Sequence, residues 1–497
     1  NKVHSTHKID KTKTVATFQE SLRATILIGR AFSLIPVAGV VTNSSNNVKF
    51  IKTSWKCAYT FLSLCGQIFM TVMCIHQVTH QTATLKGTKH TSIFITRLSW
   101  VGIEPKAYSS EGRAATNRIL TFICKYIDRI STYYTRKYID RISMYLQTNT
   151  YIQIDNNIYI QTQNKHWCSS HTFLSCVGIE PTIYSSESPM IFYGTTCITM
   201  MMFFQIARNW PTLIQNISRT EDLDPNFDGT LIKKCNVTCA VVLFLALAEH
   251  VLSLLSAFAG GEICFPQKSI YEGFVTHFYP WVFNSLPYSP ILGGVTQFLH
   301  FQSTFIWNFT DLFVICMSYY LTSRIEQVNK KLLVAQGKYL PEMFWRSTRE
   351  EYCRATTLVR KVDDVISGIV FISFANNLFF ICLQLFNTLE DGIKGTGECS
   401  SREKKSSILG GYESATYFLF SLVYLITRSL AVSLIASQVN TASKVPAPVL
   451  YDVPSPVYCV EVAGTIVTYE LVMFQFNSPS PTTTTILSNI TTTPTPA

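Results

Sequence analysis

The sequence predicts an all-α membrane protein: a seven-transmembrane helical bundle with an intracellular N-terminus and a truncated seventh helix. Three observations point to this fold class. Of the 497 residues, 47% are hydrophobic and only 14% are charged, whereas soluble domains average about 25% charged residues. Several segments are apolar for long enough to cross about 30 Å of hydrocarbon, which a soluble protein with buried helices would not need. Positive charge is also concentrated in alternate loops, as in membrane proteins of fixed orientation.

Six segments are full-length candidates for membrane spans, and a seventh is short. Residues 1–56 are expected to be cytoplasmic. Because their polar, basic start lacks the apolar core of a secretory signal, the first span is expected to direct insertion. The seventh segment, 462–476, has 15 residues, which reach about 22 Å and fall short of the hydrocarbon thickness. The full-length candidates are 57–77, 189–207, 235–258, 300–322, 364–388 and 412–436.

The distribution of Lys and Arg predicts the orientation. Four segments that the spans place on one side carry 23 Lys and Arg, and two on the other side carry 5. Cytoplasmic loops collect these residues, so we expect the N-terminus inside and, with seven spans, the C-terminus outside. This is the reverse of a G-protein-coupled receptor. The basic segments are 1–56, 208–234, 323–363 and 437–461, and the others are 259–297 and 389–411.

The loop 78–188 breaks this pattern, because it carries 12 Lys and Arg on the expected outer side. It also contains motifs that occur twice, and two copies cannot build a solenoid, which needs at least three stacked units. Two interpretations remain: an extracellular elaboration, or translated non-coding or mobile-element sequence retained in a gene model. We favour the second and expect 80–187 to be disordered. The repeats are S-W-V-G-I-E-P-K-A-Y-S-S-E at 99–111, similar to 175–187, and K-Y-I-D-R-I-S at 125–131 and 137–143.

Several motifs in the second half of the chain resemble one family. The run from Thr468 to Phe476, T-Y-E-L-V-M-F-Q-F, resembles the C-terminal motif of insect gustatory receptors. Further motifs occur in the order expected for the sugar-receptor branch, and the resemblance covers 190–477 and, more thinly, 20–77. These motifs are F-Q-I-A-R-N-W-P (204–211), F-I-W-N-F-T-D-L-F (305–313), S-R-I-E-Q-V-N-K-K-L-L (323–333), P-E-M-F-W-R (341–346), N-N-L-F-F-I-C-L-Q-L (376–385) and V-P-S-P-V-Y-C-V-E-V (453–462).

The resemblance implies a sweet taste receptor that acts as a sugar-gated cation channel in the plasma membrane of taste neurons. It also implies a homo- or hetero-tetramer with related receptors, surrounded by lipid, whose seventh helices line a central pore. The pore and gate residues would be Thr468, Tyr469, Gln475 and Phe476. Four aromatic rings at Phe476 could close such a pore by excluding water. No catalytic motif, metal site, cofactor or nucleic-acid partner is expected.

One departure from the family pattern is expected to matter for function. Sugar receptors usually have about 30 residues between the Y-C-L-E-V element and the helix that ends in the T-Y motif, but here Glu461 runs almost directly into Gly464. The chain therefore resembles a gene model with a deletion near 461. Residues 477–497 are rich in Ser, Thr and Pro and are expected to be disordered. Alternatives to a working receptor are the nonfunctional product of a faulty gene model or pseudogene, or a membrane transporter, although paired Gly/Pro-broken helices are not evident.

Polar and aromatic residues lie at similar depths in separate spans and form the candidate sugar site. Polar groups inside spans usually face a bundle interior or a cavity rather than lipid, and sugars are recognised by hydroxyl hydrogen bonds and aromatic stacking. The alternative is that these residues only tie helices together. Arg428, in the inner half of the sixth span, is expected either to extend its charged end toward the membrane surface or to pair with an acid, in a structural role. The candidate ligand-binding residues are Tyr193, Glu249, His250, Trp307, Asp311, Asn376, Asn377, Gln384 and Tyr417.

Overall fold

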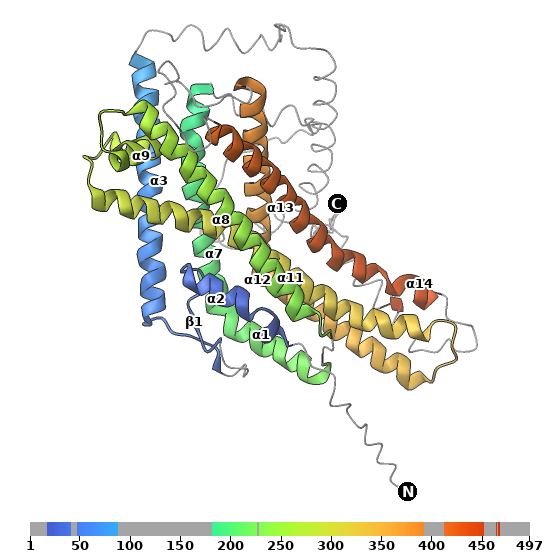
Figure 1. Cartoon of the computed structure of the whole chain (residues 1–497). Helices are drawn as coiled ribbons and strands as arrows, with labels where there is room; N and C mark the ends of the chain where they lie inside the picture. Colours follow the sequence, from blue (N-terminus) through green and yellow to red (C-terminus); the bar gives the residue numbers. More distant parts are fainter. Residues whose placement is uncertain are drawn as a thin grey trace, which may run out of the picture. The chain divides into compact units, whose positions relative to one another are not determined.

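The computed structural model of the protein describes residues 17–40, 47–87, 181–225, 228–391 and 412–451, together with 464, 466 and 467. All of them belong to one compact unit, formed by Asn1–Glu104 and Gly178–Tyr469. Its long helices pack against one another in a bundle (Figure 1). These helices are α3 (Trp55–Gly87), α7 (Pro181–Leu223), α8 (Leu231–Cys264), α11 (Pro290–Ala335), α12 (Glu342–Asp391) and α13 (Glu413–Lys444).

The helical content and the apolar helices confirm an all-α membrane protein. Each full-length span expected from the sequence falls within one long helix, apart from a single residue at the start of the last. Five helices in the described part of the chain are long and apolar enough to cross a membrane. Seven spans stay a prediction, because nearly all of 462–476 lies outside the described residues. The candidate spans are Trp55–His80, Ser188–Leu223, Leu231–Cys264, Glu342–Leu385 and Glu413–Leu450.

The helix α11 is absent from those candidates, although 300–322 was expected to be a span. The reason is its position in the bundle, where it packs against α3, α7, α8, α12 and α13. Every residue from Asn308 to Ser318 is buried. A helix enclosed by other helices need not present an apolar surface to lipid, so polar residues lower its hydropathy without exposing it. Hydropathy alone therefore fails to identify this helix as a candidate span.

The long helices extend beyond the segments that the sequence predicts as spans. The 50 residues of α12 correspond to about 75 Å, well over the hydrocarbon thickness. At the other end of the chain, α3 continues to Gly87 and α7 begins at Pro181. Both helices thus reach into the loop expected at 78–188. The remainder of that loop, with the suspected insert between the helices, lies outside the described residues, as does the tail 477–497.

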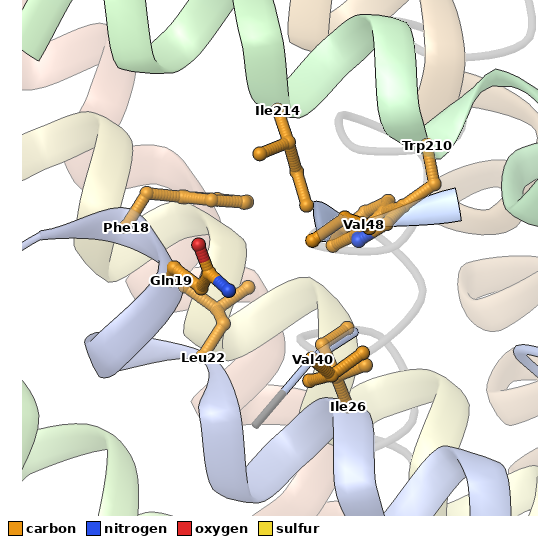
Figure 2. A pocket seen from close by; sticks show the side chains of 8 residues that line it. All are labelled: Phe18, Gln19, Leu22, Ile26, Val40, Val48, Trp210 and Ile214. Atoms are coloured by element: carbon orange, nitrogen blue, oxygen red, sulfur yellow. The ribbon is translucent and has the colours of Figure 1, made fainter. Parts of the chain in front are cut away.

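The N-terminal helices α1 (Phe18–Ser21) and α2 (Arg23–Ala31) pack against α7, α8 and α11 rather than lying free in solvent. The first N–H groups of a helix have no acceptor within that helix. The backbone N–H of Phe18, at the start of α1, donates instead to Glu221 Oε1 at 2.7 Å. Figure 2 shows the apolar side chains of these helices facing Trp210 and Ile214 of α7 across a cavity of about 10 Å³. The first helices therefore form part of the bundle core.

Short elements complete the unit. The strands β1 (Val37–Ala38) and β2 (Lys49–Phe50) pair antiparallel after α2. Between α8 and α11 lie α9 (Ile270–Phe278), which packs beside α8 (Figure 1), and α10 (Pro280–Phe283). Both contribute to an apolar cluster with residues of α3, α7, α8 and α11. The hydroxyl of Ser269 caps α9 by accepting from the backbone N–H of Glu272 at 3.3 Å. Helix α14 (Pro446–Tyr451) follows α13 and contacts α11.

Candidate functional site

A polar cluster joins α11 and α12 within the bundle. Trp307 and Asp311 lie one turn apart on one face of α11, and Ser373 and Asn377 do the same on α12. The indole Nε1 of Trp307 donates to Asn377 Oδ1 at 3.0 Å, and Asn377 Nδ2 donates to Asp311 Oδ2 at 2.9 Å. Ser373 Oγ donates to the other carboxylate oxygen of Asp311. Three residues that the sequence analysis selects are therefore linked in one chain of hydrogen bonds.

Arg428 of α13 closes this cluster from a third helix. Its Nε lies 2.8 Å from Asp311 Oδ2, and the two side chains are 2% and 0% exposed. Its terminal nitrogens donate to Asn377 Oδ1 at 3.2 Å and to Asn308 Oδ1. The guanidinium lies 4.5 Å from the ring centroid of Trp307, a favourable cation–π contact. Of the two alternatives expected for Arg428, the structure shows pairing with an acid.

A second polar chain joins α8, α12 and α13. Ser421 Oγ donates to Glu249 Oε1 at 2.6 Å, and Gln384 Nε2 donates to Ser421 Oγ at 3.0 Å. Tyr417 lies beside Glu249 and Ser421. The charges of Glu249 and Asp311 both act on Arg428, so this second chain lies close enough to the first cluster for the two to interact electrostatically. Glu249, Gln384 and Tyr417 thus share one region, as their depths predict.

The predicted residues Tyr193 and His250 lie in an aromatic layer around His300. The hydroxyl of Tyr193 and His300 Nδ1 are 3.0 Å apart, and the rings of His250 and His300 are 5.8 Å apart. Phe192 connects this layer to the first cluster, because its ring lies 6.2 Å from Trp307 and 5.7 Å from His300. These residues therefore form a separate layer that touches the polar cluster through Phe192.

A small cavity lies between α7, α11 and α12. Asn376 is 9% exposed, and its Oδ1 has no hydrogen-bond partner. The cavity measures about 10 Å³, enough for about one water molecule and far below the 300 Å³ or more of typical ligand pockets. A sugar would need this region to widen. The lining residues are Thr196, Thr199, Ile306, Trp307, Thr310, Ile372, Ser373 and Asn376.

Sequence reasoning did not select Asn308, Ser373, Ser421, Tyr424 or His300, which complete the polar contacts. Ser and Thr in helices commonly bond to their own backbone, as Thr310 does to the Ile306 carbonyl oxygen at 2.8 Å, so their presence is a weak signal. Asn308, next to Trp307 in an apolar segment, was a usable signal. The gate candidates Thr468, Tyr469, Gln475 and Phe476 lie outside the described residues. Within the described ranges, no cluster of His, Cys, Asp and Glu fits a metal ion.

Comparison with known proteins shows which family the sequence resembles. The trehalose receptor family matches residues 3–103 and 156–463, which leaves out 104–155 in the suspected insert and ends before most of the short seventh segment. The chain is 32% identical to the Drosophila melanogaster gustatory receptor for sugar taste 64f over 332 residues, 60% of this chain and 67% of that protein. It is 28% identical to the Drosophila melanogaster gustatory receptor 5a for trehalose over 327 residues, 59% of this chain and 70% of that protein.

These matches cover most of the chain, and they include α3, α7, α8, α11, α12 and α13 with the polar cluster between them. The family consists of receptors rather than enzymes. The chain belongs to the trehalose receptor family, the sugar-receptor branch of the insect gustatory receptors.

Proposed function

We propose that this chain is a sugar receptor that binds a neutral sugar in the outer half of its helical bundle. The observation that supports this most directly is the cluster of Trp307, Asn377 and Asp311 beside the cavity with the unpartnered Asn376 Oδ1. An indole face can stack on the C–H face of a sugar ring, while amide and carboxylate oxygens accept its hydroxyl hydrogens. Trp307, Ser373 and Asn376 line the cavity itself, and Asn377 and Asp311 lie directly behind it, hydrogen-bonded to Trp307 and Ser373.

Binding requires the cavity to widen. At about 10 Å³, the space holds no sugar, so the structure corresponds to a closed state in this proposal. A ligand that binds only a widened state shifts the population toward that state. The walls that must separate belong to α7, α11 and α12. Sugar binding would therefore be coupled to a movement of helices, which is what a receptor needs to transmit a signal.

We infer further that the movement opens a cation-permeable pore in a homo- or hetero-tetramer at the plasma membrane. The resemblance to gustatory receptors supports this, with the pore formed by the segment that contains Thr468, Tyr469, Gln475 and Phe476. The expected orientation has support from Cys264, at the end of α8, which is disulfide-bonded. Disulfides persist in oxidising compartments, which supports an extracellular location of this end of α8, the side that the charge distribution predicts.

Direct binding tests the proposal without requiring a working pore. The full chain would be purified in lipid nanodiscs and titrated with radiolabelled trehalose and, separately, sucrose. Trp307→Ala removes the stacking face and the N–H donor together, so we expect about tenfold weaker binding or more. Trp55→Phe, at a position that is 73% exposed at the start of α3, is the matched control and should leave binding unchanged. Equal affinity of the Trp307→Ala variant and the wild type would contradict this site.

A further inference from the structure

Arg428 contacts two other helices with different parts of one side chain. Its Nε lies 2.8 Å from Asp311 Oδ2 of α11 as an ion pair, one terminal nitrogen donates to Asn308 of α11, and the other donates to Asn377 of α12. The guanidinium carbon Cζ also lies over the rings of Trp307 and Tyr424, 4.5 and 5.2 Å from their centroids. A lysine could supply the charge, but it has no planar fork to meet these partners together.

One atom connects Arg428 to the aromatic wall of the cavity. Asn377 Oδ1 accepts from Trp307 Nε1 at 3.0 Å and from Arg428 at 3.2 Å. A ligand hydroxyl that bonds to Asn377 or takes the N–H of Trp307 must therefore change the surroundings of Arg428. Conversely, the position of Arg428 fixes the amide orientation of Asn377 and the plane of Trp307. Both side chains of the Arg428–Asp311 pair are buried, so neither can move far without displacing the residues around it.

We propose that Arg428 is a positioning residue for the sugar site: it orients Trp307 and Asn377 for the ligand and links occupancy of the site to α13. This rests on the proposed function, since it assigns the same cavity wall to the sugar. The residue need not touch the sugar. Its effect passes through Trp307 and Asn377, and it gives α13 a direct connection to a site whose cavity is lined by α7, α11 and α12.

A double-mutant cycle separates positioning from a merely structural tie. Trehalose affinity would be measured for the wild type, Arg428→Lys, Trp307→Phe and the double variant in nanodiscs. We expect Arg428→Lys to weaken binding about tenfold, which is ~1.4 kcal/mol, and to have a clearly smaller effect once Trp307 is Phe, because only the connection through Asn377 then remains. A structural role would instead give effects that add. Additive losses in affinity would overturn the proposal.

A readout without ligand keeps the test independent of sugar binding. Acrylamide quenching of the Trp307 emission is obtained by subtracting the Trp307→Phe signal, in the wild-type and in the Arg428→Lys background. We expect Trp307 to be more accessible to acrylamide when Arg428 is replaced. Unchanged quenching would overturn the positioning role, whereas absent trehalose and sucrose binding by the wild type would count against the proposed function alone.

Two further variants guard against misfolding and general effects. If Arg428→Lys does not fold, the neutral pair Asp311→Asn with Arg428→Gln removes both charges and is measured in its place, with the same expected increase in quenching. Arg324 is the matched control, because it is also buried, at 3% exposed, and donates to the Asp224 carbonyl oxygen at 2.6 Å outside this cluster. Arg324→Lys should change neither Trp307 quenching nor trehalose affinity. An equal change with Arg324→Lys would contradict a role specific to Arg428.

Discussion

Glu249 of α8 and Asp311 of α11 both act on one guanidinium, that of Arg428, so two buried carboxyl groups share a single buried cation. Their residues are 7%, 0% and 4% exposed, and Arg428 feels the charge of both acids. With all three groups ionised, the region carries one net negative charge in a poorly solvated interior. Another anion brought there would meet both repulsion and a large desolvation cost.

This charge balance predicts selectivity against sugar acids. We expect glucuronate to displace labelled trehalose at least about tenfold less effectively than glucose, since a tenfold difference needs only ~1.4 kcal/mol. Competition binding on the nanodisc-embedded chain measures this. Glu249→Gln removes one negative charge and should narrow the difference between the two competitors. Equal competition by glucuronate and glucose in the wild type would show that the ligand does not approach this charge.

The buried ion pair predicts a large loss of stability when one partner is neutralised. Asp311→Asn removes the carboxylate that pairs directly with Arg428 and leaves only the more distant charge of Glu249, so the cost should approach the ~3–5 kcal/mol of a broken buried pair. The matched control is Glu351→Gln, which breaks the bond from Lys331 Nζ to Glu351 at 2.6 Å between side chains that are 45% and 12% exposed. That loss should be ~0–1 kcal/mol. Thermal unfolding in nanodiscs and surface expression compare the two variants, and losses of similar size would refute the distinction.

Hydropathy and charge predicted the helices because the membrane imposes simple rules on spanning segments. These rules predict less well a helix that is surrounded by other helices instead of lipid. The polar content of α11 reflects its enclosure between Asn308 and Ser318, a fact of packing that no single segment carries. The N-terminal region was expected only to be cytoplasmic, yet Phe18 and Thr25 are buried against other helices. A short apolar face in a polar, basic segment gives too little signal for tertiary docking.

For the candidate site, the sequence predicted individual residues but not their contacts. A Trp, an Asp or an Asn within an apolar segment must find partners, so Trp307, Asp311 and Asn377 could be selected without a structure. Which partners they find depends on helix rotation and register, which residue type does not specify. For this reason the shared acceptor Asn377 Oδ1 and the central position of His300 emerged only from the structure.

Two glycines give a matched test of N-terminal docking. A Cβ on Gly29 would lie 2.5 Å from Phe309 Cζ, and Phe309 is held by Phe203 and Phe313 with ring centroids 5.5 and 6.2 Å away. Gly29→Ala should therefore overpack the core and cost ~1–3 kcal/mol. Gly294 has no atom within 4 Å of such a Cβ, so Gly294→Ala should be neutral or stabilise α11 by up to ~1 kcal/mol. Thermal unfolding compares them, and equal stability would contradict tight docking of α2.

Partial desolvation of the His277 imidazole in α9 predicts a modest loss of stability in acid. The residue lies at the exposed surface of α9, but neighbouring protein atoms desolvate its ring, disfavour the charged imidazole and lower the pKa of His277 below its ordinary value. The folded protein then binds this proton less readily than the unfolded chain, so its contribution is complete above about pH 6.5. It is lost as pH falls through the lower folded-state pKa. The unfolding temperature would be measured from about pH 7.5 down to about pH 4.5, a range that includes the ordinary histidine pKa. It should fall less steeply with decreasing pH in His277→Gln than in the wild type. Identical slopes would exclude His277 as a contributor.

The short segment after Glu461 predicts how the chain behaves as a channel. Its 15 residues, 462–476, reach about 22 Å and cannot span about 30 Å of hydrocarbon. We therefore expect no sugar-evoked current from the chain expressed alone, measured by whole-cell recording with trehalose and sucrose. Insertion of about 30 residues of a related receptor after Glu461, sufficient to complete a span of roughly 20 residues, should restore the current. In that repaired receptor Phe476→Ala should leak cations without sugar, because a ring of aromatic side chains no longer excludes water. A robust current from the unaltered chain would show that the short helix suffices.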